Sequence, residues 1–470
     1  MFEFLMDDGL YSHVHFIGIG GVSMSGLAEI LITQGYKVSG TDSKENPILS
    51  RLNKMGAKIF IGHKAENIQG ADLIIYTDAI STDNVELKAA FDSTADVIDR
   101  ATFLGALMKN YTNSIAVSGT HGKTTTTSMI ATITKGLEFN PTMLIGGNLN
   151  DIGGNVRLGS KNYILTEACE YKANILKYFP TMAIILNMDE DHLDYFRDMN
   201  HIIETFKGYA NNLESDAYLL INSDDENASK IIENTSANIV TFGIDNDADY
   251  SAEYVSYSDE GCVTFTLNIR DKEYYPVKLS VMGKHNVSNA LAAIASTHSL
   301  GIPINIIIDN ISEYKGVGRR LELKGYYNNI RIIDDYAHHP TEISATLQAI
   351  SSNVDGKVYC IFQPHTYTRT KILLDNFANS FKGADKVIIT DIYAAREVDN
   401  GEVHSRDLAE AVMKNGIDCS YLSTFAEAED YLLENAKAGD IILTMGAGNI
   451  YKLGENILGM DKEDAEKKAV

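Results

Sequence analysis

The chain has 470 residues, of which 44% are hydrophobic and 22% charged, an ordinary composition that corresponds to about three globular domains. Lys and Arg number 40 against 64 Asp and Glu, and this net charge of −24 argues against nucleic acid or an anionic membrane as the main partner. The sequence holds no apolar run of roughly 18 residues and no CxxC pair among its four cysteines, so we expect no membrane span, no disulfide framework and a reducing cytoplasm.

The first block of the chain is typical of a parallel, doubly wound α/β sheet. Short apolar strands are expected at 14–17, 36–40, 58–61 and 73–77, with a helical pattern after the first of them. This alternation of strand and helix predicts a Rossmann-like domain at the N-terminus.

A glycine turn follows the first strand of this block and opens the helix. Gly18, Gly20 and Gly21 let the backbone approach an anion at a helix N-terminus, and Asp42 ends the next strand, where it could hold a ribose hydroxyl. The third glycine of the dinucleotide fingerprint is replaced by Ser23, so NAD is only one candidate ligand. The alternative is a tight turn with no ligand.

The second block carries expected strands at 114–117, 163–166, 182–186 and 217–221. Between Ile239 and Leu279 the pattern changes to alternating strands with turn residues, which predicts a small antiparallel insert. A helix over 286–300 is expected to close the block.

The strongest motif of the chain lies in this second block, where a strand passes through a glycine loop into a helix. Such a loop wraps a polyphosphate in N–H donors, places an ammonium on the β/γ oxygens and a hydroxyl on Mg²⁺. Val117 stands where the usual spacing has another glycine, so the loop is shorter than the common Walker form. The residues concerned are Gly119, Thr120, His121, Gly122, Lys123, Thr124 and Thr125.

Three other segments of the second block carry polar groups of interest. Glu170 follows a strand and could hold Mg²⁺, or it could form a surface ion pair. His192 lies in an acidic run, 187–194, that suits a second cation or is simply a solvated loop. Asn286 and Asn289 could bind a nucleotide, or Asn286 could cap its helix.

The third block, from about residue 319, has expected strands at 331–333, 358–362, 386–390 and 441–444 and predicts another α/β domain. Arg320, at the junction of the blocks, could bridge a transferring phosphoryl group or form an interdomain salt bridge. Asp335 and His338 follow a strand and could hold an ammonium or accept its proton. Segments 363–369 and 391–396 end later strands and could face the same cleft.

Two phosphate-type loops on two blocks narrow the possible functions. A dehydrogenase needs the first loop and a motor or switch NTPase needs the second. An enzyme that uses ATP to activate a substrate bearing a nucleotide needs both.

The segments that carry these residues resemble the Mur ligase family, and within it the alanine-adding branch and its peptide-recycling relative. In chain order they are HFIGIGGVSMSGLAEIL, GTHGKTTTTSMI, EACEY, NMDEDHLDYF, GKHNVSNALAA, GVGRR, DDYAHHPTEI, FQPHTYTRT and DIYAAREV. Several other Mur ligases place a carbamylated lysine where this chain has Phe206, with Lys207 beside it.

The resemblance implies three domains: a Rossmann-like UDP-sugar domain at 1–110, a P-loop ATPase with the insert at 111–318, and a Rossmann-like closing domain at 319–470. It implies that ATP and Mg²⁺ serve to join L-alanine to the lactyl carboxylate of UDP-N-acetylmuramate through an acyl phosphate, in peptidoglycan precursor synthesis.

By the same resemblance, each predicted site residue takes a role. Gly18, Gly20, Gly21 and Asp42 would hold the UDP-sugar, residues 119–125 with Asn286 and Asn289 would bind ATP, and Thr124, Glu170 and His192 would hold metal. Lys123, Arg320, Asp335 and His338 would be catalytic, with Asp335, Tyr336 and His338 at the amino acid.

Three rival functions stay open. The nearest is a recycling ligase that joins a whole tripeptide to the same sugar, and a more distant one is a nicotinamide dehydrogenase that leaves the second loop unexplained. A non-enzymatic reader of UDP-sugars is the third. A cytoplasmic monomer or weak homodimer is expected.

Overall fold

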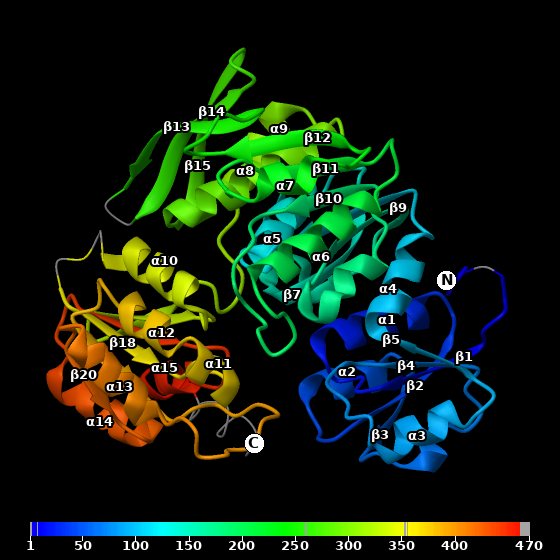
Figure 1. Ribbon diagram of the computed structural model, residues 1–470, viewed down its shortest axis with the longest axis horizontal. Coiled ribbons are helices and arrows are strands. Elements are labelled where there is room, and N and C mark those ends of the chain that lie inside the picture. The colour runs from blue at the N-terminus through cyan, green and yellow to red at the C-terminus, as the bar shows by residue number, and fades with distance from the viewer. Residues whose placement is uncertain (1, 7, 259–260, 352–353, 355, 461–470) are drawn as a thin grey trace. The chain divides into compact units, whose positions relative to one another are not determined.

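The structure is a computed structural model that describes residues 2–6, 8–258, 261–351, 354 and 356–460 (Figure 1). The chain divides into two compact units by its internal contacts. Unit 1 comprises Met1–Met188, His201–Phe242 and Ala292–Pro303, and unit 2 comprises Asp189–Asn200, Gly243–Leu291 and Ile304–Val470.

The N-terminal part of unit 1 is a five-stranded parallel sheet in the order β3-β2-β1-β4-β5. This order confirms the predicted Rossmann-like arrangement, and it adds β5, which the sequence pattern did not predict. The strands are β1 (His13–Ile17), β2 (Lys37–Asp42), β3 (Lys58–Ile61), β4 (Leu73–Tyr76) and β5 (Asp96–Asp99). The helices are α1 (Val22–Thr33), α2 (Pro47–Lys54), η1 (Ala65–Ile68), α3 (Val85–Phe91) and α4 (Arg100–Met108).

The glycine turn after β1 packs tightly against the neighbouring strand. A Cβ added to Gly40 in β2 would lie 2.6 Å from the Ile19 side chain and 2.8 Å from the Phe16 carbonyl oxygen. Any larger residue at Gly40 would therefore displace the turn, which explains a glycine in the middle of a buried strand.

The rest of unit 1 is built on seven strands in the order β12-β11-β10-β6-β9-β7-β8, parallel except for β8. They are β6 (Asn113–Ser118), β7 (Pro141–Leu149), β8 (Gly154–Arg157), β9 (Ser160–Glu167), β10 (Met182–Ile185), β11 (Tyr218–Asn222) and β12 (Asn238–Gly243). The helices of this region are α5 (Lys123–Thr134), η2 (Asn150–Ile152), η3 (Tyr171–Lys177), α6 (Met199–Asn211) and α7 (Ala228–Ile232). Helix α8 (Lys284–Ser299) is divided between the units, with its residues up to Leu291 in unit 2 and those from Ala292 in unit 1.

One boundary of the predicted insert was wrong. The residues from Ile239 were expected to begin an antiparallel insert, but β12 pairs in parallel with β11. The antiparallel strands are β13 (Tyr250–Tyr257), β14 (Cys262–Ile269) and β15 (Glu273–Met282), which belong to unit 2. A short apolar strand reads the same in either direction of pairing, so the pattern alone did not separate β12 from the insert.

The C-terminal part of unit 2 is a six-stranded sheet in the order β16-β17-β21-β18-β19-β20. All its strands are parallel except the edge strand β16, as expected for a second Rossmann-like domain. They are β16 (Glu322–Tyr327), β17 (Ile330–Asp335), β18 (Val358–Phe362), β19 (Lys386–Ile389), β20 (Cys419–Tyr421) and β21 (Ile441–Met445). The helices are α9 (Ile304–Ser312), α10 (Pro340–Ser351), α11 (Tyr367–Ile372), α12 (Leu374–Ser380), α13 (Ser405–Lys414), α14 (Phe425–Asn435) and α15 (Tyr451–Ile457).

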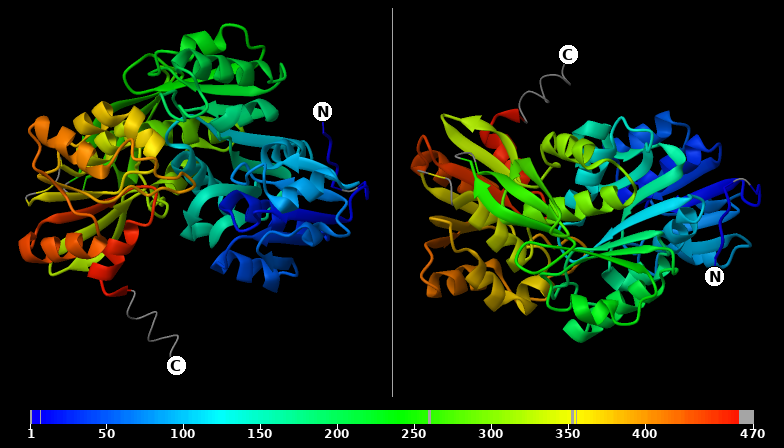
Figure 2. Two further views of the ribbon diagram at one scale, coloured as in Figure 1. Left: turned by 60° about the horizontal axis from the view of Figure 1, so that its bottom comes forward. Right: turned by 90° about the horizontal axis from the view of Figure 1, so that it is seen from above.

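Strand β18 shows why this sheet is buried on both faces. Val358, Cys360 and Phe362 pack into one core with α10, α12 and α13, whereas Tyr359 and Ile361 pack into a second core with α14 and α15. Because side chains alternate along a strand, a continuous apolar run supplies both cores. Figure 2 draws the helices that flank this sheet. The carboxyl ends of the parallel strands are thereby left to carry the polar loops.

Among the described residues, no helix is long and apolar enough to cross a membrane. All four cysteines are free thiols. Cys360 and Cys419 are buried, whereas Cys169 and Cys262 are only partly buried.

Candidate active site

The glycine turn of unit 1 uses all four of its backbone N–H groups inside the protein. Gly18 and Ile19 donate to the Thr41 carbonyl oxygen at 2.8 and 3.1 Å, and Gly21 donates to the Gly18 carbonyl oxygen at 3.3 Å. Gly20 donates to Asp42 Oδ2 at 2.9 Å. The sequence predicts an anion at this turn and at the N-terminus of the helix that follows it. Within the described residues, the amides of Val22, Ser23 and Met24 in the first turn of α1 have no partner and are the available donors.

A network of buried polar side chains adjoins this turn through Thr41, and it was not predicted from the sequence. Glu86 is fully buried and accepts hydrogen bonds from Thr41 Oγ1 at 2.5 Å, from His15 Nε2 at 2.9 Å and from His63 Nδ1 at 2.7 Å. These contacts lower the pKa of Glu86, although its burial alone would raise it. Histidines at 13 and 15 in an otherwise apolar strand were the available sequence signal.

The second loop has the geometry expected of a phosphate loop between β6 and α5. Gly119 and Gly122 have φ of 127° and 85°, a region that favours glycine. Asn187, at the end of β10, accepts from the His121 amide at 2.8 Å and donates from Nδ2 to the His121 carbonyl oxygen at 3.1 Å. We expected Asn187 in a cation site, but its side chain braces the loop instead.

Lys123 and Glu170 form a buried ion pair beside the loop. Lys123 Nζ lies 3.0 Å from Glu170 Oε2 and also donates to the carbonyl oxygens of Gly119 and Thr120. Their side chains are only 16% and 3% exposed. Burial alone would lower the pKa of Lys123, but the Glu170 carboxylate raises it, so the ammonium stays charged. Glu170 does form an ion pair, but the pair is buried, so the alternative of a surface ion pair was wrong.

Other residues near the loop have plainer roles. Glu167 accepts the Gly146 amide at 2.6 Å and so ties β9 to β7. Phe206, at the position of the modified lysine of other Mur ligases, is fully buried. Lys207 pairs with Glu233 at 3.5 Å.

In unit 2 the acidic segment 189–192 contacts the C-terminal sheet region. Arg369 Nη2 and Nε lie 2.7 and 3.2 Å from Asp191 Oδ1, which also accepts the His192 amide at 2.6 Å. Burial alone would raise the pKa of Asp191, but His192 and Arg369 lower it strongly. Arg369 had been expected only to face a cleft, and its pairing with Asp191 could not be read from the sequence.

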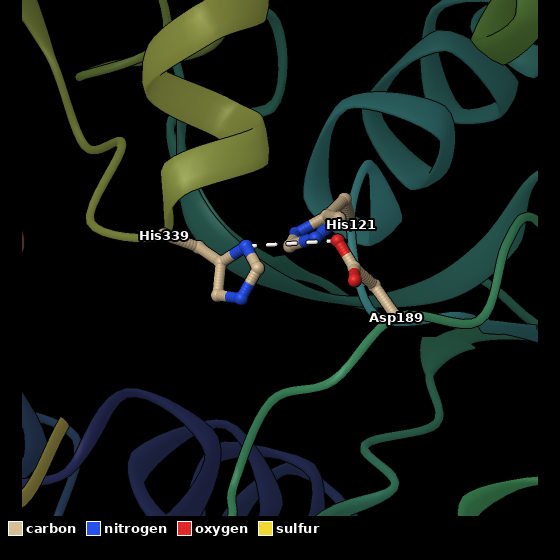
Figure 3. A group of neighbouring side chains, drawn as sticks. All are labelled: His121, Asp189 and His339. Carbon is tan, nitrogen blue, oxygen red and sulfur yellow. Dashed lines mark ion pairs between the residues drawn. The ribbon is translucent and has the colours of Figure 1, made fainter. Parts of the chain in front are cut away.

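Asp189 and His339 lie on the same side of unit 2, with an ion pair of 3.6 Å between His339 Nδ1 and Asp189 Oδ2 (Figure 3). Thr341 Oγ1 donates to the same carboxylate oxygen at 2.6 Å, and His339 Nε2 lies 3.0 Å from the Glu190 carbonyl oxygen. In the segment expected to be a second cation site, the Asp189 carboxylate thus contacts residues at the start of α10.

The two arginines of the Gly-Arg-Arg segment have different surroundings. Arg319 donates to Asp334 at 3.0 Å and to the carbonyl oxygens of Gly446 and Gly448 at 2.7 and 3.0 Å. These bonds lie within the C-terminal sheet, so they are not an interdomain salt bridge. Both guanidinium groups stack on the Tyr336 ring, with that of Arg319 4.9 Å and that of Arg320 5.0 Å from its centroid. The guanidinium N–H groups of Arg320 make no such hydrogen bonds within the described residues, which leaves them available for an anion.

Asp335 ends β17 and is buried. Its two oxygens accept the backbone amides of Leu321 and Ala337, each at 2.7 Å. Burial raises the pKa of Asp335 to about 6, with Arg320 and the two amides opposing the rise. The carboxyl group is therefore mostly ionised at neutral pH and retains lone pairs for an ammonium.

His338 lies three residues further on, with Nδ1 3.0 Å from the Tyr336 carbonyl oxygen. Because a carbonyl only accepts, Nδ1 carries the proton and Nε2 presents a lone pair. Burial lowers the pKa of His338 to about 3. A neutral His338 can accept a hydrogen bond from an amine, but it is a weak base, which favours Asp335 for taking a proton.

Asn286 and Asn289 lie on one side of α8 and are buried. Asn286 Nδ2 donates to the Met282 carbonyl oxygen at 2.8 Å, and Asn289 Nδ2 donates to Asn286 Oδ1 at 3.1 Å. Asn286 lies inside the helix, which begins at Lys284, so the alternative that it caps the helix was wrong. Burial and Arg320 lower the pKa of the neighbouring His285 to about 4.

Three family models match successive parts of the chain. The Mur ligase family catalytic domain matches residues 13–112, the Mur ligase middle domain 117–297, and the Mur ligase glutamate ligase domain 319–448. The chain belongs to the Mur ligase family. It has the three-domain α/β fold of that family.

Curated Mur ligases with this sequence pattern align over almost the full chain. A UDP-N-acetylmuramate–L-alanine ligase of Acetivibrio thermocellus is 50% identical over 97% of this chain and 97% of its own length. One from Caldanaerobacter subterraneus is 48% identical over 96% of this chain and 98% of its own.

Solved Mur ligase structures agree in fold. A UDP-N-acetylmuramate–alanine ligase from Thermotoga maritima has a TM-score of 0.81 at 29% identity, covering 97% of this chain and all of that one. A murein peptide ligase from Psychrobacter arcticus has a TM-score of 0.72 at 26% identity, covering 95% and 98%.

Proposed function

We propose that this Mur ligase joins L-alanine to the lactyl carboxylate of UDP-N-acetylmuramate at the expense of ATP, in peptidoglycan precursor synthesis. One observation carries this proposal: unit 1 holds both a phosphate loop, with Lys123 paired to Glu170, and a glycine turn on a Rossmann-like sheet. The names of the curated relatives support the choice of sugar and amino acid.

The chemistry needs ATP because a carboxylate does not react with an amine directly. In the proposed reaction a lactyl carboxylate oxygen attacks the γ-phosphorus and ADP leaves, giving an acyl phosphate. The alanine amine, after losing a proton, then attacks the acyl carbon and phosphate leaves. The acyl phosphate hydrolyses readily, so closure of the C-terminal domain to exclude water is expected.

In unit 1 the loop residues 119–125 would bind the ATP phosphates, with Lys123 on the β/γ oxygens. The Lys123 ammonium would exchange its bonds to the two loop carbonyl oxygens for phosphate oxygens while Glu170 keeps it charged. Thr124 and Glu170 offer the hard oxygen donors that fit Mg²⁺, whereas the His192 nitrogen is a poorer ligand for that ion. Bound Mg²⁺ would neutralise charge on the transferring phosphoryl group.

We propose that the UDP-sugar binds at the glycine turn, with the amides that follow the turn as hydrogen-bond donors. The residues of this site are Gly18, Gly20, Gly21 and Asp42. In unit 2, Arg320 is proposed for phosphoryl charge, and Asn286 and Asn289 for the nucleotide. Asp335, Tyr336 and His338 are proposed for alanine, with Asp335 holding the ammonium and His338 Nε2 accepting a further N–H bond.

We propose domain boundaries at 1–110, 111–318 and 319–470, and a cytoplasmic monomer or weak homodimer without nucleic-acid or membrane partners. The contact-based units cut across these boundaries, because the acidic segment 189–200 and the strands β13–β15 group with the C-terminal sheet.

A phosphate-release assay tests the proposed reaction. With UDP-N-acetylmuramate and ATP present, we expect release on adding L-alanine, weaker release with glycine or L-serine, and little with the tripeptide. One methyl group is worth only about 1–3 kcal/mol, so some use of glycine is expected. A preference for the tripeptide would support the recycling ligase instead, and hydride transfer to NAD without ATP use would support the dehydrogenase.

A further inference from the structure

The glycine turn by itself is poorly equipped to hold a diphosphate. All four of its amides are already bonded within the protein, and one of them, that of Gly20, is bonded to the Asp42 carboxylate. A diphosphate at this turn would meet the charge of Asp42 and only the three amides of the first turn of α1. A cation near that turn is needed to offset the repulsion.

Arg100, the first residue of α4, is such a cation. It is partly buried in unit 1, and its Nη1 lies 3.4 Å from Ser23 Oγ in the first turn of α1. The guanidinium also lies near the buried Tyr178 hydroxyl. Burial raises the pKa of that hydroxyl, and the positive charge of Arg100 lowers it. A neutral hydroxyl does not neutralise the arginine charge.

The carboxylates close to Arg100 are engaged elsewhere. Asp99 caps α4 through the amides of Ala101 and Thr102 and pairs with Lys177 at 2.9 Å. Asp78 accepts from Asn174 at 3.0 Å and lies 3.5 Å from Lys172.

Within the described part of the chain, no carboxylate lies within ion-pair distance of Arg100. A partly buried guanidinium without a carboxylate partner is stabilised by an anion that binds to it. Its presence beside a helix N-terminus therefore points to an anionic ligand that completes the charge balance.

We propose that Arg100 binds the diphosphate of the UDP-sugar together with the first-turn amides of α1. This inference rests on the proposed function for the identity of the ligand. In it, Arg100 donates N–H bonds to diphosphate oxygens, and the ligand supplies the counter-charge that the described residues do not provide within ion-pair distance. Arg51 of the same domain is a matched contrast, because it already pairs with Glu29.

The test is calorimetric binding of UDP, UDP-N-acetylglucosamine and UDP-N-acetylmuramate to the full chain and its Arg100→Gln, Arg100→Lys and Arg51→Gln variants. UDP-N-acetylglucosamine has the diphosphate but lacks the lactyl carboxylate. We expect Arg100→Gln to weaken all three ligands by a similar factor, about 10- to 100-fold, as for the loss of a charged hydrogen bond. Arg100→Lys should show a smaller loss, and Arg51→Gln a change of less than about twofold.

Turnover separates this role from a structural one. In Arg100→Gln the KM for UDP-N-acetylmuramate should rise by the same factor while the KM for ATP stays unchanged. The thermal midpoint without ligand should not fall, since the replacement breaks no ion pair of the described residues. If Arg100→Gln does not fold, Arg100→Lys still gives the comparison among the three ligands.

Three results would overturn the inference. The first is unchanged affinity for the three ligands in both Arg100 variants. The second is a loss of affinity confined to UDP-N-acetylmuramate, which would place Arg100 at the lactyl carboxylate. The third is an equal loss of affinity in Arg51→Gln. Failure of the proposed function is distinguishable, because the wild-type chain would then bind UDP-N-acetylglucosamine, with Arg100 dependence, yet release no phosphate with alanine.

Discussion

Replacing Lys123 by Met should both stop the reaction and destabilise unit 1, and the structure allows the two effects to be separated. The side chain of Glu170 is 3% exposed, and its ion-pair partner is Lys123 Nζ at 3.0 Å. Removing the ammonium would break this buried ion pair from one side, which costs about 3–5 kcal/mol. The loss of one group that stabilises charge in the transition state costs on the order of 10²–10³ in rate.

The decisive variant is therefore the double replacement Lys123→Met with Glu170→Gln. It removes both charges, so most of the lost stability should return, because a buried pair replaced by neutral groups is often close to neutral. Phosphate release should not return, because the ammonium is still missing. UDP-sugar binding should survive in the double variant, since the glycine turn is separate from the P-loop in the fold.

The assays are thermal unfolding without nucleotide, followed by phosphate release with all three substrates. Each kcal/mol corresponds to roughly 2–4 °C for a domain of about this size, so Lys123→Met should melt at least several degrees lower than the wild type. Lys135→Met is the control, because its pair with Asp151 is 47% and 35% exposed and should contribute less than about 1 kcal/mol. Wild-type turnover in the double variant would refute the assignment of Lys123, and an unchanged midpoint in Lys123→Met would refute the energetic argument.

Three further outcomes are expected. Asp335→Asn should raise the KM for alanine much more than the KM for ATP, and unchanged alanine kinetics would remove Asp335 from the amino-acid site. Burial raises the pKa of Asp335 to about 6, so the folded state binds the proton of this carboxyl group more tightly than the unfolded state does. The protonated carboxyl group therefore stabilises the fold. This stabilisation is complete below about pH 4 and is lost as the pH rises through 6. The stability of the wild type relative to Asp335→Asn, from denaturant titrations, should thus fall by up to ~3 kcal/mol between pH 4 and pH 7, and a flat difference would contradict it. Gly119→Ala should weaken ATP binding, because φ at this residue is 127° and the new Cβ would lie 3.0 Å from Leu186 Cβ. A fluorescent-nucleotide titration measures this affinity, and an unchanged value would show that the loop relaxes freely.

Much of the fold follows from local pattern. The strand at 358–362 and the strand at 58–61 were predicted with the bounds that the structure shows. For the strand at 358–362 the continuous apolar run reflects burial directly, whereas the strand at 58–61 is only half-buried and is marked by its apolar residues between turns. The strand β5 at Asp96–Asp99 was missed, because its polar ends and half-buried centre resemble a loop. The parallel pairing of β12 was also missed, since pairing direction is a property of the neighbour and not of the strand itself.

The sequence by itself determined where chemistry can occur: glycine turns at strand ends, a lysine at the start of α5, and polar segments after apolar strands, all set by local backbone requirements. Only the tertiary structure decided how the charges are matched. It pairs Lys123 with Glu170, 47 residues away, and Arg369 with Asp191, 178 residues away. Among the residues that the structure describes, it places no carboxylate within ion-pair distance of Arg100. The physical reason is that a charged side chain interacts through space over a few ångströms, and which residues come that close depends on how distant segments pack.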